Sequence, residues 1–237
     1  MNPVLAEILR TRQSPAADGK GTVAVHSTIS DEEGELLTRL IAERKPSVSL
    51  EIGLAFGVSA LFICEAMSRS SARPHHIVID PAQNAPEYWQ GIGLANLRRA
   101  GYSGFVEFIE KPSQIALPEL VAAGRKADFA FIDGEHTFDH VLVDFFFVDQ
   151  MLNVGGVVVL DDAGWPSIRR VARFIAANRN YAVLGHAGSD QTEKSRRHRN
   201  DTPEAVEFDW RFGIQGECLA FEKKADDNRP FNHFVEF

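Results

Sequence analysis

Carboxylates follow four short apolar runs of this sequence, each at the point where the run ends. They are Glu51, Asp80, Asp133 and the adjacent pair Asp161 and Asp162. If the runs are parallel strands, their carboxyl ends share one edge of an open α/β sheet, which is where such sheets bind ligands. We therefore expect an acidic edge that suits a cationic ligand and disfavours a polyanionic one.

Three of these carboxylates, Asp133, Asp161 and Asp162, come from two strand ends and are expected to converge. Hard oxygen donors of this kind suit Mg²⁺, Mn²⁺ or Ca²⁺, with waters and substrate oxygens completing the shell. The alternative is that the acids cap the helices that follow, as Asp commonly does. The residues alone leave both interpretations open.

His136 follows Asp133 by three positions, which brings a titratable ring to the same strand end. A neutral imidazole is a suitable general base near pH 7. A lone histidine near a helix start is otherwise a structural cap or a surface residue. Trp165, in the turn after Asp162, packs either on a substrate or in the core.

An apolar strand ending in Glu51 runs into a glycine-bearing turn and then a helix. Gly53 and Gly57 let the backbone approach a ligand, and Ser59 can offer its hydroxyl and nearby N–H groups to a carboxylate or phosphate. A dinucleotide-binding turn is the rival interpretation. It is disfavoured because the compact G-x-G-x-x-G spacing is missing and because Glu51 would repel a pyrophosphate.

The run Glu51-Ile52-Gly53, followed by Gly57-Val58-Ser59-Ala60, resembles the first motif of the class I S-adenosylmethionine-dependent methyltransferases. More narrowly, it resembles the O-methyltransferases related to catechol O-methyltransferase. The resemblance covers about residues 30–185, and Ala55 departs from the more general E-x-G-x-G-x-G pattern. It implies a single Rossmann-like α/β domain with a mostly parallel seven-stranded sheet, an antiparallel last strand and helices on both faces.

The same resemblance implies roles for individual residues. Asp80 would bind the ribose hydroxyls of the cofactor, and the segment 110–114 would contact the adenine. The divalent metal ligands would be Asp133, Asp161 and Asp162, although the family often has Asn at the last position. Asp133-x-x-His136 is similar to the macrolide-sugar O-methyltransferases, in which such a histidine deprotonates a metal-bound hydroxyl. The implied cofactor-binding residues are Glu51, Gly53, Gly57, Ser59, Asp80, Ser113 and Asp133.

Alternating strand and helix patterns are expected to position these residues. The predicted strands are 47–52, 76–80, 105–109, 128–133, 155–161, 181–184 and 217–222. The predicted helices are 59–68, 88–100, 138–152 and 166–178, and a capping-box pattern at Ser30 predicts one more helix before the first strand. Residues 1–46 are expected to form a helical cap and substrate-side segment, and residues 47–237 the methyltransferase core, with an insertion at about 185–216.

The insertion contains a charged stretch, residues 190–204, with four basic and four acidic side chains. Because these charges cancel, a solvated loop is favoured over an anion site, and as an insertion it could cover a substrate.

His75 and His76 are expected at the surface, and Phe145, Phe146 and Phe147 in the interior. The apolar tail, with Phe231, Phe234 and Phe237, is expected to dock on the domain or on a second subunit, and a homodimer is common for this fold.

The composition limits the classes of binding partner that we expect. The 237 residues carry 25 Lys and Arg against 33 Asp and Glu, for a net charge of -8. Nucleic acid is therefore not expected as a partner, because phosphate contacts need positive charge. The two cysteines cannot build a disulfide framework, and no apolar stretch is long enough to span a membrane. We expect a cytoplasmic protein that acts on a small molecule.

Together these features predict an S-adenosylmethionine-dependent O-methyltransferase that acts on a hydroxyl of a small molecule or sugar. It would use a divalent metal and His136 as base. The first alternative is a metal-independent methyltransferase with another acceptor, such as a nitrogen or a protein. The others are a nucleotide-cofactor oxidoreductase, which Glu51 disfavours, and a non-catalytic cofactor-binding protein of the same fold.

Overall fold

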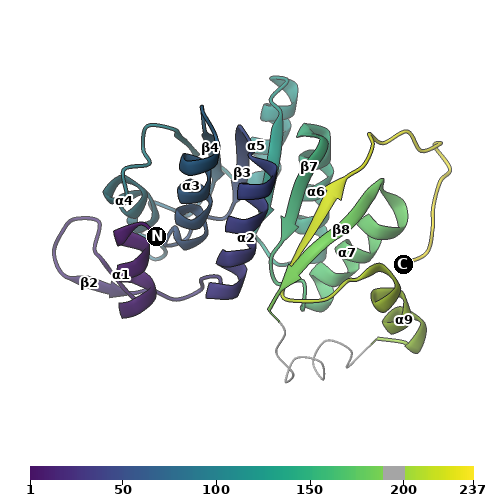
Figure 1. Cartoon of the computed structure of the whole chain (residues 1–237), viewed down its shortest axis with the longest axis horizontal. Coiled ribbons are helices and arrows are strands. Elements are labelled where there is room, and N and C mark those ends of the chain that lie inside the picture. The colour runs from purple at the N-terminus through teal and green to yellow at the C-terminus, as the bar shows by residue number, and fades with distance from the viewer. Residues whose placement is uncertain (189–200) are drawn as a thin grey trace. The chain divides into compact units, whose positions relative to one another are not determined.

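The computed structural model describes residues 1–188 and 201–237 of the chain (Figure 1). It divides into two compact units, Met1–Leu120 and Val121–Phe237, which are described one at a time below. Among the described residues, none of the helices combines the length and the apolar character that a membrane span would require.

The first unit contains three parallel strands in the order β5-β4-β3. They are β3 (Val48–Ile52), β4 (His75–Ile79) and β5 (Val106–Ile109). The residues of β3 and β4 are almost all buried, as expected for parallel strands covered by helices on both faces. In register, Leu50 lies opposite Ile77, so Glu51 and Asp80 come at neighbouring carboxyl ends.

Helices surround these strands. Helix α2 (Asp31–Arg44) begins with the predicted capping box: the Ser30 N–H donates to Glu33 over 2.6 Å and the Glu33 N–H donates to Ser30 over 3.3 Å. Helix α2 packs against α3 (Val58–Ser70), and α3 also contacts α4 (Ile92–Arg99). Helix α5 (Ser113–Ala122) follows β5.

The N-terminal segment forms α1 (Pro3–Thr11) and a small hairpin of β1 (Gln13–Pro15) and β2 (Thr22–Ala24). Strand β1 contacts both α1 and α4, and Figure 1 shows the hairpin extending beyond these helices. Helix α1 belongs to the N-terminal segment that was expected to be helical, although its bounds were not predicted, and α5 was not predicted.

The second unit contains four strands in the order β6-β7-β9-β8. They are β6 (Ala127–Ile132), β7 (Leu152–Leu160), β8 (Tyr181–Ala187) and β9 (Cys218–Lys223). Strands β6 and β7 are parallel, whereas β9 runs antiparallel to both β7 and β8 (Figure 1). Its helices are α6 (Phe138–Met151), α7 (Pro166–Asn178) and α9 (Pro203–Phe212), and α7 contacts both of the others.

The main sheet thus has seven strands, three in the first unit and four in the second, and its last strand is antiparallel. This confirms the predicted fold class. Helix α4 begins at Ile92 instead of the predicted 88, because Gln90 and Gly91 have positive φ angles of 53° and 74° that no α-helix accommodates.

Some finer sequence predictions are wrong. His76 is fully buried in β4, because its ring is held between polar partners inside the first unit. Phe146 is 49% exposed, because α6 turns that side chain away from the buried Phe145. The stretch 190–204 lies mostly outside the described residues, but its described end is no solvated loop: Asp201 is paired with Arg173, and α9 begins at Pro203.

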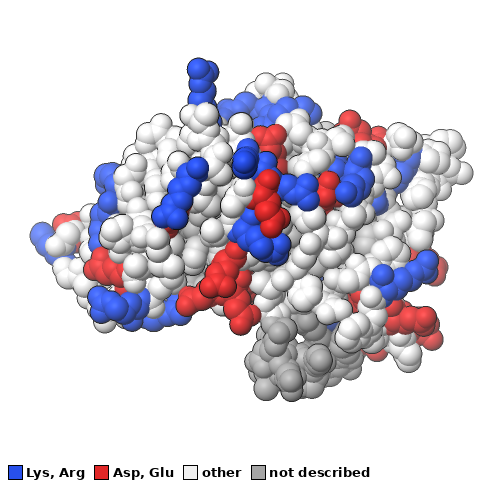
Figure 2. Space-filling view, in the orientation of Figure 1, with Lys and Arg blue, Asp and Glu red and all other residues white. Residues whose placement is uncertain are grey.

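The apolar tail is partly docked within the second unit. Val235 exchanges two hydrogen bonds with Asn178 of α7, each of 2.8 Å, and Phe237 packs on Phe174 of the same helix. Phe231 is fully exposed. Figure 2 shows Lys and Arg side chains interspersed with Asp and Glu on the face it presents, without a continuous basic surface there.

Candidate functional site

The predicted glycine turn after β3 has the backbone conformation that its glycines allow. Gly53 and Gly57 have φ angles of 93° and 79°, and Ala55 between them has a φ of 46°. A Cβ at Gly57 would lie 3.1 Å from the Gly93 carbonyl oxygen of α4, so the turn packs closely on that helix. The turn is therefore fixed both by its backbone angles and by its contact with α4.

Side chains that the sequence reasoning did not single out hold the carbonyl groups of this turn. The Gln83 amide donates to the Ala55 carbonyl over 2.9 Å, and Asn96 of α4 donates to the Phe56 carbonyl over 3.0 Å. Both side chains are fully buried. They follow the strand end at Asp80, but an isolated Gln or Asn carries no spacing signal that would have identified them.

Asp80 lies at the end of β4 and is almost fully buried. One of its carboxylate oxygens accepts hydrogen bonds from the backbone N–H groups of Leu54 and Ala55, at 3.0 and 3.1 Å, and the other accepts from the Ala82 N–H at 2.8 Å. Asp80 thus holds the glycine turn. Its predicted contact with ribose hydroxyls stays a prediction.

Glu51 and Ser59, which were also predicted to bind the cofactor, contact each other inside the first unit. The Ser59 hydroxyl donates to one Glu51 oxygen, and the other Glu51 oxygen lies 2.9 Å from the His76 ring. The second ring nitrogen of His76 lies 2.7 Å from the Ser49 hydroxyl. Because Glu51 and His76 have no exposed surface, this network orients the end of β3 from within.

The start of α3 offers hydrogen-bond donors beside the same turn. Its N-cap is Gly57, which provides no side-chain cap, so the N–H groups of the first turn can serve a carboxylate or phosphate. Ser113, predicted near the adenine, begins α5 just beyond β5 and is partly exposed. Asn84, in the loop after Asp80, donates to Glu110 over 3.0 Å and so links the loops after β4 and β5.

The predicted catalytic and metal residues lie together in the second unit, at the ends of β6 and β7. The Nε2 atom of His136 lies 3.3 Å from an Asp133 oxygen and 3.1 Å from an Asp162 oxygen. All three side chains are partly buried. Two carboxylates thus converge on one ring nitrogen, and the Ser167 hydroxyl fixes the backbone of the same residue by donating to the His136 carbonyl over 2.7 Å.

The segment Asp161–Trp165, which we call the acidic turn, has a strained backbone. Asp162 has a φ of 49°, which is uncommon for a residue with a side chain, although Asp and Asn adopt it more readily than most. The Ala163 N–H donates to the Glu217 carbonyl over 2.5 Å, and the Trp165 N–H donates to the Asp162 carbonyl over 2.8 Å. These bonds hold the Asp162 carboxylate toward His136.

Glu217, just before β9, is a charged neighbour that the sequence reasoning missed. Its carboxylate lies against Gly164, where an added Cβ would collide with the Glu217 carboxylate oxygens. Burial raises the pKa of the Asp162 carboxyl above its usual value, the Glu217 charge raises it further, and His136 opposes both. Only the antiparallel pairing of β9 with β7 brings Glu217 here, so no local sequence signal could have indicated it.

Trp165 is 50% exposed and its ring centre lies 5.5 Å from that of His136. Its indole is therefore at the surface of the site and not in the core. Of the two alternatives that the sequence left open, exposure favours contact with a bound molecule, and the tilted packing on His136 gives that ring one fixed apolar neighbour.

The donor chemistry of Asp133, Asp161 and Asp162 suits a hard divalent cation. Two of these carboxylates already converge on a single point, the His136 Nε2 atom, and one oxygen of Asp161 is buried at the same strand end. Within residues 1–188 and 201–237, however, no three acidic, His or Cys side chains are arranged as a complete metal site. These residues therefore fit a divalent cation in the type of their donor atoms and in the convergence of two of their carboxylates.

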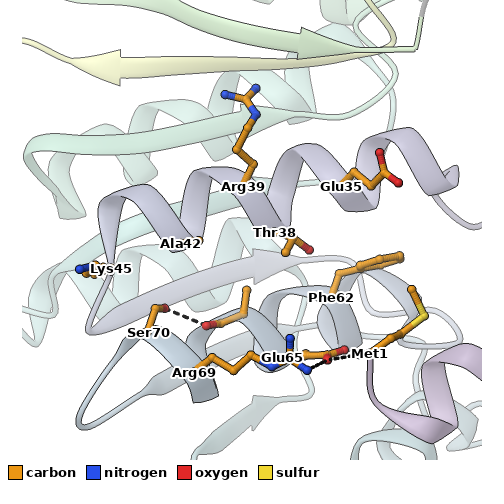
Figure 3. Close-up of a pocket in the computed structure, with 11 residues that line it drawn as sticks. Met1, Glu35, Thr38, Arg39, Ala42, Lys45, Phe62, Glu65, Arg69 and Ser70 are labelled. Atoms are coloured by element: carbon orange, nitrogen blue, oxygen red, sulfur yellow. Dashed lines mark hydrogen bonds and ion pairs between the residues drawn. The ribbon is translucent and has the colours of Figure 1, made fainter.

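A separate pocket of about 680 Å³ lies in the first unit between α2 and α3. Figure 3 shows Thr38 and Ala42 of α2 facing the pocket opposite Phe62 and Arg69 of α3, with Glu65 paired to Met1 and Arg69 at its rim. None of the predicted site residues lines it. The glycine turn precedes the part of α3 that does, so the pocket does not belong to the candidate site.

Comparison with known proteins identifies the class of domain. Residues 50–163 match the family model of a methyltransferase domain. This range includes the glycine turn, Asp80, Asp133, His136 and Asp161–Asp162.

Two curated relatives are plant enzymes. A caffeoyl-CoA O-methyltransferase of Stellaria longipes is 27% identical over 139 residues, which cover 56% of this chain and 52% of that protein. A putative caffeoyl-CoA O-methyltransferase of Arabidopsis thaliana is 26% identical over 155 residues, covering 62% and 61% respectively. Each match therefore spans less than two thirds of the relative's length.

Solved structures share the fold. An O-methyltransferase from Bacillus cereus, in complex with SAH, superposes with a TM-score of 0.63 at 19% identity, covering 78% of this chain and 83% of that one. An O-methyltransferase of tomaymycin synthesis from Streptomyces achromogenes, in complex with SAM, gives 0.61 at 20% identity, with coverages of 78% and 82%. These matches confirm the α/β fold and the predicted resemblance. Residues 50–163 thus match a methyltransferase domain, and the chain is similar to O-methyltransferases in sequence and in fold.

The positive φ of Ala55 leads to a stability prediction. A residue with a Cβ loses about 1–2 kcal/mol in the left-handed region, whereas glycine loses about 0.5–1 kcal/mol of backbone entropy. We therefore expect Ala55→Gly to raise the free energy of unfolding in urea by about 0.5–1 kcal/mol. The control is Ala95→Gly in the helical conformation of α4, which should lower it by about 1 kcal/mol. Equal effects of the two substitutions would contradict the role given to the Ala55 backbone.

The raised pKa of Asp162 leads to a pH prediction. In the folded protein the carboxyl keeps its proton above the ordinary value of 3.8, while the unfolded chain has released it. The free energy of unfolding therefore falls as pH rises through the window between 3.8 and the folded pKa, and the cost persists above it. We expect Asp162→Asn to be more stable than the wild type at pH 7 in EDTA.

The advantage of Asp162→Asn should shrink as pH falls toward 3.8, leaving only the backbone preference of Asn for a positive φ. Unfolding measured by circular dichroism between pH 4 and 8 tests this. The control is Glu135→Gln, which removes the same charge from an exposed side chain of the second unit. A stability difference that does not change with pH would contradict the assigned cause.

Proposed function

We propose that this protein transfers the methyl group of S-adenosylmethionine to a hydroxyl oxygen of a small molecule or sugar. The carbon–sulfur bond of the donor breaks as the carbon–oxygen bond forms, the hydroxyl proton passes to a base, and S-adenosylhomocysteine is released. The observation that carries the proposal is the convergence of Asp133 and Asp162 on His136. It gives a methyltransferase domain a positioned base at a strand end.

The first unit would bind the cofactor. S-adenosylmethionine, when bound, supplies a methyl group already activated by the positive sulfur. The residues present fit it in three ways: the glycine turn keeps side chains off the backbone, the first turn of α3 provides N–H donors for a carboxylate, and Asp80 is an acceptor at the next strand end. Glu51 acts from behind the turn, through Ser59.

Asp133 and Asp162 would orient the base. Since both carboxylates lie on the Nε2 side of His136, the neutral ring is assigned its proton on Nε2, which leaves the lone pair on Nδ1. Two negative neighbours also stabilise the imidazolium that forms when the ring takes the hydroxyl proton. Trp165, half-exposed beside the ring, would exclude water from one side and contact the acceptor.

A divalent cation is part of the proposal. Asp133, Asp161 and Asp162 would hold it, as the oxygen donors of this site suit Mg²⁺ or Mn²⁺. When bound, it would lower the pKa of an acceptor hydroxyl. The assignment of His136 as base does not depend on it, because the contacts of the ring with Asp133 and Asp162 are present in the chain itself.

Replacing the base tests the reaction. We expect His136→Gln to lower kcat by about 10²–10⁴, since a positioned general base contributes that much. Release of S-adenosylhomocysteine is measured with phenolic, catechol and sugar hydroxyl acceptors. Affinity for S-adenosylhomocysteine, measured by calorimetry, should not change.

The matched control is His140→Gln, the same substitution four residues further along the chain, where the ring contacts Thr137. Its kcat should stay within about twofold of the wild type, far above the loss expected for a general base. Full activity in His136→Gln would contradict the role of the base. Failure of the wild type to bind S-adenosylhomocysteine would contradict the proposed cofactor.

Removing the metal tests the cation separately. After dialysis against EDTA we expect turnover to fall, and to return on addition of Mg²⁺ or Mn²⁺ but not of K⁺ at equal ionic strength. Asp161→Asn should weaken the restoring effect, because it removes one of the three proposed oxygen ligands. Unchanged turnover in metal-free buffer would refute the metal and leave the methyltransferase with His136 alone as base.

A further inference from the structure

A buried cluster of charges lies beside the acidic turn in the second unit. Arg169 and Arg173 of α7 are only 2% and 1% exposed, and Asp209 of α9 is 2% exposed. Asp201, just before α9, completes the cluster with a side chain that is 15% exposed. Two guanidinium groups and two carboxylates balance in charge, which is the condition under which buried charges are tolerated.

Arg173 binds both carboxylates. It makes two hydrogen bonds to Asp209, each of 2.7 Å, and two to Asp201, of 3.0 and 2.8 Å. Burial by itself would lower the pKa of the Arg173 guanidinium, but these bonds raise it above its usual value. Arg173 therefore fastens α9 to α7, and its contacts with the two carboxylates use both sides of its guanidinium group.

Arg169, one helical turn earlier, extends the cluster to the acidic turn. Its Nε and one terminal nitrogen donate to the Ala163 carbonyl, each over 3.3 Å, and that terminal nitrogen also lies 3.2 Å from the Gly164 carbonyl. Its other terminal nitrogen lies 3.8 Å from Asp209 and 4.0 Å from Asp201. Arg169 thus lies between the carboxylates of the cluster and the backbone that directly follows Asp162.

The contact of Arg169 matters because the two carbonyl groups belong to the residues that directly follow Asp162. Asp162 has a strained φ, and a strained backbone persists only where its surroundings hold it. Glu217 holds the N–H side of Ala163, and Arg169 holds the carbonyl side of the same residue. Without the second contact, the turn could relax, and the Asp162 carboxylate and Trp165 would lose their positions beside His136.

We propose that Arg169 is a positioning residue for the methyl-transfer site: clamped by Asp209 and Asp201, its guanidinium fixes the acidic turn and thereby the alignment of Asp162 and Trp165 with His136. The inference rests on the proposed function for its effect on turnover, but not for its effect on the turn. Lysine cannot replace this role, because its single ammonium group does not span carbonyls and carboxylates on opposite sides.

The experiment compares Arg169→Lys with Arg173→Lys, which both keep the charge: Arg169 donates to the acidic turn, whereas Arg173 donates to Asp209 and Asp201. We expect Arg169→Lys to lower kcat by about 10–100-fold, the size of effect seen when an outer partner of a site is removed. Affinity for S-adenosylhomocysteine should be unchanged. Arg173→Lys should lose similar thermal stability while kcat stays within about twofold of the wild type.

A second measurement needs no activity. The chain has three tryptophans, so Trp89→Phe combined with Trp210→Phe leaves Trp165 as the single emitter. In that background we expect Arg169→Lys to shift the emission of Trp165 and to alter its quenching by acrylamide, and Arg173→Lys to leave both unchanged. If Arg169→Lys does not fold, Arg169→Gln is used instead, since its amide can still donate to one carbonyl.

Three results would overturn the inference. They are an unchanged Trp165 signal in the Arg169 variant, equal changes in both arginine variants, and a changed Trp165 signal with normal kcat. The last would show that the turn is held by Arg169 but that the site does not depend on it. A wild type without methyl transfer would instead contradict the proposed function, and the fluorescence comparison would still decide whether Arg169 holds the turn.

Discussion

The carboxylate of Asp80 is the contact on which the first unit depends. A turn that leaves a strand with three positive φ angles exposes backbone N–H groups that no regular hydrogen bonding satisfies, and leaving them unpaired in a buried place would be costly. Asp80 accepts from two of them. Because it lies on the neighbouring strand, its contact with the turn also ties the ends of β3 and β4 together. The cofactor-binding role predicted for this edge is built on that arrangement.

In the second unit a strained turn is likewise held by contacts, and these come from charged residues in more distant parts of the chain. Its acidic turn is held from one side by the backbone of Glu217 and from the other by Arg169. Charged groups lie on both sides of this turn, but their electrostatic effects differ. Near Asp162, burial raises the pKa of the carboxyl and the Glu217 charge adds to it, whereas between α7 and α9 two arginines balance two aspartates. The acidic turn thus lies next to a cluster whose own charges balance.

The sequence predicted much of this structure where the signal is local. The capping box at Ser30 and Glu33, and α7 with its bounds at Pro166 and Asn178, are formed as expected. All seven strands of the main sheet were predicted, since apolar runs ending in Gly, Pro or Asp are typical of buried parallel strands. The start of α4 was predicted too early, because helical periodicity does not reveal the positive φ of Gln90.

The candidate site was predicted as a set of residues, and only the structure decides what each one contacts. Residue type and spacing bring Asp133 and His136 to one strand end, because three positions along a chain that leaves a strand are never far apart. Spacing could not reveal that His76 is buried against Glu51, that Glu217 lies against Gly164, or that Arg169 reaches the carbonyls of the acidic turn.

By itself, therefore, the sequence determined the order of the elements, the class of the fold and the acids at its strand ends. The tertiary structure decided which of these acids hold backbone and which face a ring nitrogen, and it placed two other acids, Asp201 and Asp209, against arginines. The physical reason is that secondary structure follows from contacts within a few residues, while the surroundings of a buried charge come from strands and helices that are distant in the chain.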